Sequence, residues 1–266
     1  MSIKGIIRQA QGSHWYSKDG TPMFEVPSAD GKRTVKTNIT HARKLDLYPS
    51  VTTVMKVLDK PDIDTWRVER AIKASIASKR QHGERIKQFI ERILDRAQSK
   101  STNAVEFGSD VHKYIEGLYT GNNFDSVLIP QATKDALAAY FKANVASAKC
   151  EQLAINHSMG YAGTIDMDAV LTDTSEFHNC LYDFKTQGTK PGKPAMFYDD
   201  FIIQLGAYSL CGSYGCIRSL IISSTEPGRI EVKEYTEQET RKGQDIFRHL
   251  TALFRLIKGL PLHGGK

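Results

Sequence analysis

The feature that most constrains this chain is a change of sequence pattern close to Lys149. Before it, charged and apolar residues recur at the three- and four-residue spacing of amphipathic helices. After it, short runs rich in β-branched and aromatic residues are separated by Gly, Asn, Asp and Ser, which is typical of strands and turns. Helices followed by strands predict an α/β (α+β) fold, in which helices flank a mixed central sheet.

The N-terminal half divides into a region of turns and a region of helices. Residues 1–50 are rich in Gly, Ser, Thr, Pro and Asp and predict a small β/loop region. Residues 51–149 predict a helical elaboration that begins where Ser50 can cap a helix. The expected helical segments are Val51–Leu58, the charged stretch Asp64–Lys100 with a candidate break at His82–Gly83, a helix that starts near Ser109, and Gln131–Lys149.

Residues 150–266 are expected to form the core of one integrated domain together with the helical region. The apolar spacing predicts a closing helix with Gly259 just beyond its end. The expected elements are strands at Glu151–His157, Gly160–Leu171 and Cys180–Thr186, a helix at Gln204–Gly215, strands at Ser219–Ser224 and Arg229–Tyr235, and a helix at Glu237–Lys258.

Composition and charge exclude several classes of protein. Among 266 residues, 36 Lys and Arg stand against 30 Asp and Glu, a net charge of +6 that suits an anionic partner such as nucleic acid. No run of about eighteen apolar residues is present, so no membrane span is expected. The first residues resemble neither a signal peptide nor a transit peptide, which predicts a cytoplasmic protein of a bacterium or a phage-infected host. Four cysteines are too few for a disulfide scaffold.

A carboxylate and an ammonium stand two residues apart in the predicted strand Leu181–Lys185. Because side chains alternate along a strand, Asp183 and Lys185 should share one face while Tyr182 and Phe184 enter the core on the other. The carboxylate can bind a hard divalent cation, and the ammonium can orient a water or balance the charge of a phosphate. An exposed ion pair would produce the same triplet, so the triplet alone does not decide the function.

Further polar residues are placed to join this pair. Asp166 lies in a predicted strand, so that two aspartates from adjacent strands can share one metal ion. His112 and Glu116 are four residues apart on one helical face and can supply a third ligand and its partner. Gln204 and Tyr208 have the same spacing and can meet a phosphate, a base edge or the lysine. Each of these residues also fits an ordinary surface or core position.

Taken in order, these motifs resemble a known family. Gly108-x-x-x-His112 with Ile115–Glu116, then Gly163–Asp166, Asp183–Lys185 and Gln204-x-x-x-Tyr208 resemble the RecB-type exonuclease branch of the PD-(D/E)XK nucleases. Pro49–Val54, followed by Trp66–Arg67 and the charged helix, is similar to the mitochondrial genome maintenance exonucleases and their phage and bacterial relatives.

The resemblance implies a restriction-endonuclease-like fold and a set of residue roles. Asp166, Asp183 and Lys185 would be catalytic. The metal, Mg²⁺ or Mn²⁺, would be held by His112, Asp166, Asp183 and the carbonyl of Phe184. Substrate would be bound by Gln204, Tyr208, Glu116, Trp66, Arg67 and Arg70. The four cysteines, at 150, 180, 211 and 216, do not match the layout that binds an iron–sulfur cluster in some relatives, so no cluster is expected.

The expected activity is that of a metal-dependent DNA exonuclease that prefers single-stranded DNA or unpaired ends, in repair, recombination or replication. Asp64–Lys100 carries ten Lys or Arg and five acids, a local charge of +5 that suits a phosphate backbone as well as a solvated helix. A non-catalytic binding protein and an endonuclease for RNA or structured duplex stay open. Contributions of Asp168 and Glu151 to the metal site also stay open, although the position of Glu151 suggests a structural role.

Overall fold

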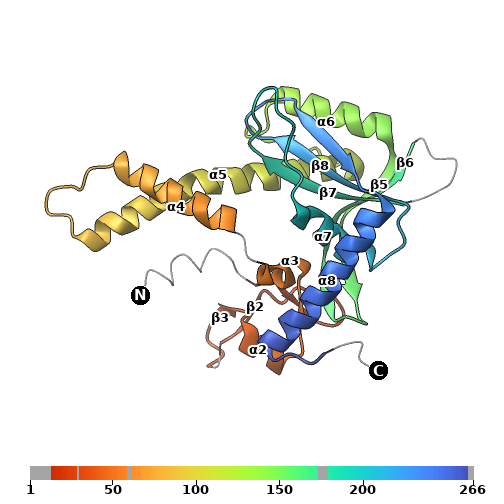
Figure 1. Cartoon of the computed structure of the whole chain (residues 1–266), viewed down its shortest axis with the longest axis horizontal. Coiled ribbons are helices and arrows are strands. Elements are labelled where there is room, and N and C mark those ends of the chain that lie inside the picture. Colours follow the sequence, from red (N-terminus) through yellow and green to blue (C-terminus); the bar gives the residue numbers. More distant parts are fainter. Residues whose placement is uncertain (1–12, 29, 59–60, 173–178, 263–266) are drawn as a thin grey trace.

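The central element is a five-stranded mixed sheet, which confirms the predicted α+β arrangement (Figure 1). The computed structural model describes residues 13–28, 30–58, 61–172 and 179–262. The strand order is β5-β6-β7-β8-β9, in which only β7 and β8 are parallel. Their bounds are β5 Val145–Asn156, β6 Tyr161–Leu171, β7 Asn179–Gln187, β8 Cys216–Ser223 and β9 Ile230–Glu234.

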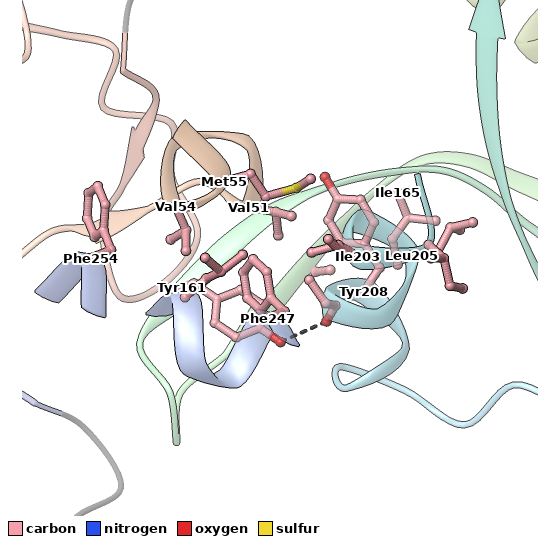
Figure 2. Packing of buried hydrophobic residues seen from close by; sticks show 14 of the residues in the cluster. Val51, Val54, Met55, Tyr161, Ile165, Ile203, Leu205, Tyr208, Phe247 and Phe254 are labelled. Carbon is pink, nitrogen blue, oxygen red and sulfur yellow. Dashed lines mark hydrogen bonds between the residues drawn. The ribbon is translucent and has the colours of Figure 1, made fainter. Parts of the chain in front are cut away.

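Helices cover both faces of this sheet. On one face, α5 (Ile86–Thr120) and α6 (Gln131–Asn144) pack in a cluster that contains Tyr182 and Phe184. On the other, α7 (Asp199–Ser209) and α8 (Glu237–Lys258) pack in a cluster that contains Leu181. Figure 2 shows this second cluster, where the Tyr161 hydroxyl donates a hydrogen bond to the carbonyl of Ala207 at 2.7 Å. The predicted alternation along β7 is therefore confirmed.

The N-terminal region packs against the second cluster. Strand β1 (Trp15–Tyr16) pairs with β4 (Tyr48–Pro49), and β2 (Glu25–Pro27) pairs with β3 (Thr34–Lys36), as expected of a small β/loop region. Ser50 caps α3 (Val51–Val54), which continues into the 3₁₀ helix η1 (Met55–Val57), as predicted. Helix α2 (Ile39–Lys44) was not expected; it forms because the Asn38 side chain caps it and Ala42 is buried.

A long helical hairpin projects from the body of the molecule (Figure 1). It consists of α4 (Pro61–Ile76) and the first half of α5, and the predicted break at His82–Gly83 falls in its connection. The predicted start of a new helix near Ser109 is wrong, because α5 is continuous through Gly108. That glycine lets the helix lie close to β7, since an added Cβ would come within 3.1 Å of Thr186 Oγ1.

Two other predicted boundaries are wrong, while the last helix is confirmed. Helix α6 ends at Asn144 instead of Lys149, because the chain already pairs with β6 from Val145 onward. Helix α7 begins at Asp199, where two acids in its first turn complement the helix dipole, and ends before the predicted range does. Helix α8 has the predicted bounds, with Thr236 as its N-cap and Gly259 in a left-handed conformation beyond it.

No helix in the described part of the chain is long and apolar enough to cross a membrane.

Candidate metal centre

The candidate site lies where strands β6 and β7 separate. Their pairing ends at Met167 and Tyr182, although the same register would next place Asp166 opposite Asp183. Beyond that point β6 pairs with β5 and β7 pairs with β8. At this fork the backbone N–H of Phe184 donates to Asp166 Oδ2 at 2.7 Å, so a carboxylate replaces the missing strand partner. Both predicted aspartates therefore stand at the fork.

Strand β6 also changes its orientation at Asp166. Tyr161 and Ile165 belong to the cluster under α7 and α8, whereas Met167 belongs to the cluster under α5 and α6. In a regular strand these odd-numbered residues would share one face. Glu151, which the register places opposite Asp166, has a positive φ of 50°. The two strands are thus kinked together, and Glu151, Asp166 and Asp183 form one row across three strands.

Helix α5 adds a histidine to this row. His112 Nδ1 lies 3.4 Å from Glu151 Oε1 and 3.8 Å from Asp166 Oδ1. The imidazole packs edge-on against Phe184, with ring centroids 5.5 Å apart. One ligand atom from each of His112, Glu151 and Asp166 lies within 4.8 Å of the others. An imidazole and two carboxylates at this separation are a suitable donor set for a divalent cation.

Asp183 and Lys185 form an ion pair beside this group, in which Asp183 is buried and Lys185 is partly exposed. Lys185 Nζ donates to Asp183 Oδ1 at 2.6 Å and to Gln204 Oε1 at 3.2 Å. Asp183 is only 1% exposed, and its Oδ2 atom accepts no hydrogen bond from any described residue. A buried carboxylate oxygen without a donor is costly unless a cation or a water meets it. The residues present therefore fit a bound metal.

The pKa values reflect this concentration of charge. Burial raises the pKa of Asp183 to about 6, although the charge of Lys185 opposes the shift. Burial lowers the pKa of Lys185, but the carboxylates of Asp183 and Asp166 outweigh it and the net shift is upward. For His112, burial lowers the pKa, but the hydrogen bond that the imidazole donates to Glu151 and the charge of Asp166 outweigh it, so its pKa is also raised. Without a metal, Asp183 and His112 therefore hold their protons to a higher pH than the free side chains do.

An open cleft of about 760 Å³ gives access to the group. His112 and Glu151 form part of its wall, so these two candidate ligands face solvent on this side. Glu116, predicted to contact substrate, lines the same cleft one helical turn after His112. The other lining residues are Ala104, Val105, Gly108, Ser109, Lys113, Thr186, Gln187, Gly188 and Ser224.

The remaining predicted residues are not gathered at the cleft. Tyr208 is 5% exposed and fills the space beside Gly163, where an added Cβ would lie 2.8 Å from its ring. Arg70 lies on α4, in the projecting hairpin. The side chains of Trp66 and Arg67 lie outside the described part of the structure.

The sequence left the contribution of Glu151 open and favoured a structural role for it. The structure places this residue with His112 and Asp166, whereas a structural role was expected for it. A signal was present, because Glu151 is the one acidic residue of β5 and a tight turn near Met159 aligns it with Asp166. Asp168, the other open candidate, accepts a hydrogen bond from Asn179 Nδ2 at 3.3 Å and stands outside the group.

Comparisons with known proteins do not assign the chain to a family. No family model matches it, and no curated protein matches its sequence. The crystal structure of SSO0001 is similar at 13% identity and a TM-score of 0.32, over 71% of this chain and 86% of that one. A similarity at this TM-score supports no inference about fold or activity.

Proposed function

We propose that this protein is a metal-dependent deoxyribonuclease of the PD-(D/E)XK type, an exonuclease that acts on single-stranded DNA or on unpaired ends. The observation that carries the proposal is the convergence of His112, Glu151 and Asp166 beside the ion pair Asp183–Lys185. These residues come from one helix and three strands, and the order of their motifs is the one that resembles the RecB-type nucleases.

Each group in the site has a distinct task in phosphodiester hydrolysis. His112, Glu151, Asp166 and the free Oδ2 of Asp183 would hold Mg²⁺ or Mn²⁺. When bound, such a cation lowers the pKa of a coordinated water and polarises a phosphate oxygen. Lys185 is held in place by Asp183 and Gln204, so that its remaining N–H donor can orient a water or stabilise negative charge on the phosphate.

The preference for an unpaired strand rests on the resemblance and on charge. The hairpin of α4 and α5 contains most of the Asp64–Lys100 segment, with its charge of +5. Because α5 continues from this hairpin to His112, a strand that follows the basic helices is led to the cleft. Such contacts bind phosphates without reading sequence, as a general exonuclease requires.

The direct test is digestion of end-labelled single-stranded DNA with Mg²⁺ or Mn²⁺. Wild type should release short products, while Asp183→Asn and Lys185→Ala should lose activity at least a hundredfold because a metal ligand and a charged donor are removed. Asp168→Asn is the matched control, since this aspartate stands on the same strand as Asp166 but outside the group. Persistent activity in both site variants would refute the assignment.

A panel of substrates tests the specificity. Single-stranded DNA, duplex DNA, flapped DNA and RNA should be cleaved in a ratio that favours unpaired DNA ends. Internal cleavage of closed circles or of RNA would instead identify an endonuclease. Salt-dependent DNA binding without turnover in any divalent ion would identify a non-catalytic binding protein.

A further inference from the structure

The loop that joins β7 to α7, residues 188–198, begins three residues after Lys185. Gly188 lines the cleft, and the side chain of Gln187 donates to the carbonyl of Met196 at 3.3 Å. The loop therefore leaves the cleft wall and returns to it. The roles proposed above use none of the side chains of this loop.

The backbone of the loop is held firmly by neighbouring strands. The guanidinium of Arg229 donates to the carbonyl of Lys190 at 3.1 Å and also to the carbonyl of Lys193. The N–H of Ala195 donates to Glu231 Oε2 at 3.0 Å, and Glu231 in turn accepts from Arg229. A loop fixed at several points loses little conformational entropy when it binds a ligand.

Several side chains of the same loop are exposed. Met196 is 62% exposed and Tyr198 is 49% exposed. Lys190 and Lys193 are exposed too, and neither ammonium pairs with an acid in the described part of the chain. Two unpaired cations and an exposed aromatic ring on one loop match the chemistry of a nucleic-acid strand, whose phosphates pair with ammonium groups and whose bases stack on rings.

Tyr198 also lies close to the proposed chemistry. Its ring packs edge-on against Phe201, with centroids 5.6 Å apart. The Phe201 ring in turn lies 5.6 Å from Lys185 Nζ. A single aromatic side chain therefore separates Tyr198 from the lysine that would face the scissile phosphate, so a base stacked on Tyr198 would belong to a nucleotide near that phosphate.

We propose that the 188–198 loop is a DNA-binding subsite, in which Tyr198 stacks on a base near the scissile phosphate and Lys190 and Lys193 bind neighbouring phosphates. The subsite rests on the proposed nuclease function and adds the residues that position its substrate. Because every base has a stacking face and every nucleotide has a phosphate, binding to this subsite does not depend on the DNA sequence.

The test measures binding of fluorescent oligothymidine to the full-length protein, with Asp183→Asn in every sample to prevent cleavage. Loss of one stacked base weakens binding by about 1–3 kcal/mol, so Tyr198→Ala should raise Kd roughly 5- to 150-fold. Tyr198→Phe keeps the ring and should stay within about twofold. Lys190→Gln with Lys193→Gln should lower the slope of log K against log salt by about 1.4.

Two controls make the result specific. A series of oligonucleotides, each with an abasic nucleotide at a different position, is compared. In the protein that retains Tyr198, one position should weaken binding; in Tyr198→Ala, the same position should have no effect. Lys242→Gln, an exposed lysine on α8, should leave affinity and salt slope unchanged. Thermal unfolding midpoints equal to that of the parent protein exclude misfolding as the cause of any loss.

Two results would overturn the subsite. One is unchanged affinity and salt slope in the loop variants; the other is a loss in Tyr198→Phe as large as in Tyr198→Ala. If wild type cleaves DNA while the loop variants bind normally, the subsite is refuted and the nuclease function stands. If wild type does not cleave, the nuclease function is refuted, and the binding data still decide whether the loop holds DNA.

Discussion

At the scale of single residues, the site is governed by charges that lie close together around the buried Asp183. Asp183 and His112 both have raised pKa values, so both hold protons at a pH at which the free side chains would have lost more of them. The stability that such a group contributes to the metal-free protein is present below its unfolded-state pKa and lost as pH rises through the folded-state value. For Asp183 this loss falls between about pH 4 and pH 6.

Metal affinity should consequently rise with pH. A divalent cation must displace the protons on Asp183 and His112, so the affinity for Mn²⁺ should increase by up to about tenfold per pH unit for each proton released between pH 5.5 and 7.5. Titration calorimetry in buffers of different ionisation enthalpy measures both the affinity and the number of protons. Asp168→Asn should keep the same dependence, whereas a flat profile in wild type would contradict the proposed ligands.

Glu151 provides a second test at this scale. Its carboxylate contacts His112 and belongs to the donor group, so Glu151→Gln should reduce nuclease activity and Mn²⁺ affinity at least tenfold. Glu106→Gln, an exposed acid on α5, serves as the control and should behave as wild type. An equal effect of the two substitutions would show that Glu151 acts only through its surface charge and is not a metal ligand.

At the scale of elements, the position of Gln204 depends on how closely α7 and α8 cross. The crossing is built from two glycines: a Cβ on Gly206 would lie 2.6 Å from the backbone of Gly243, and one on Gly243 would lie 2.4 Å from the carbonyl oxygen of Ile202. Backbone atoms cannot move aside as a flexible side chain can. The two helices are therefore held at a spacing that only glycine permits, and α7 brings Gln204 to Lys185.

Gly243→Ala should therefore destabilise the fold. The added methyl forces α8 away from α7, and overpacking of this kind lowers the free energy of unfolding by about 1–3 kcal/mol. Urea unfolding in the presence of EDTA measures the change. Lys242→Ala, the exposed neighbour on the same helix, should alter stability by less than about 0.5 kcal/mol. A Gly243→Ala protein as stable as wild type would show that the crossing can relax.

At the scale of the whole molecule, the candidate metal centre lies in the body, and most of the basic segment Asp64–Lys100 lies in the projecting hairpin. Helix α5 spans about 52 Å and belongs to both parts, with His112 in its second half and basic residues in its first. Within the body, Phe107, Val111 and Ile115 of this helix are buried against the sheet. The candidate metal centre is thereby attached to the core, while the charged hairpin extends from it.

The hairpin should dominate the salt dependence of DNA binding. Lys79→Gln with Lys87→Gln removes two exposed charges and should lower the slope of log K against log salt by about 1.4 for single-stranded DNA. Fluorescence anisotropy over a range of KCl concentrations measures the slope. Lys32→Gln with Lys242→Gln removes two exposed charges elsewhere, and an equal reduction there would argue against a hairpin-bound strand.

Local sequence determined the features that depend on neighbours along the chain. Helical and strand periods predicted most elements, and Gly259 predicted the end of α8, because capping involves residues within a turn. The alternation that sends Asp183 and Lys185 to one face and Tyr182 to the other is equally local.

Only the tertiary structure decided which of these residues meet. The fork between β6 and β7, the kink at Asp166 and the inclusion of Glu151 depend on where strand pairing ends. Helix α5 continues through Gly108, where it lies close to β7. The sequence around this glycine does not reveal that approach, because it involves a distant strand. Strand register and helix packing bring together residues that are far apart in the chain. Local sequence patterns therefore indicated which chemical groups could form a site, and the tertiary structure determined which of them lie together.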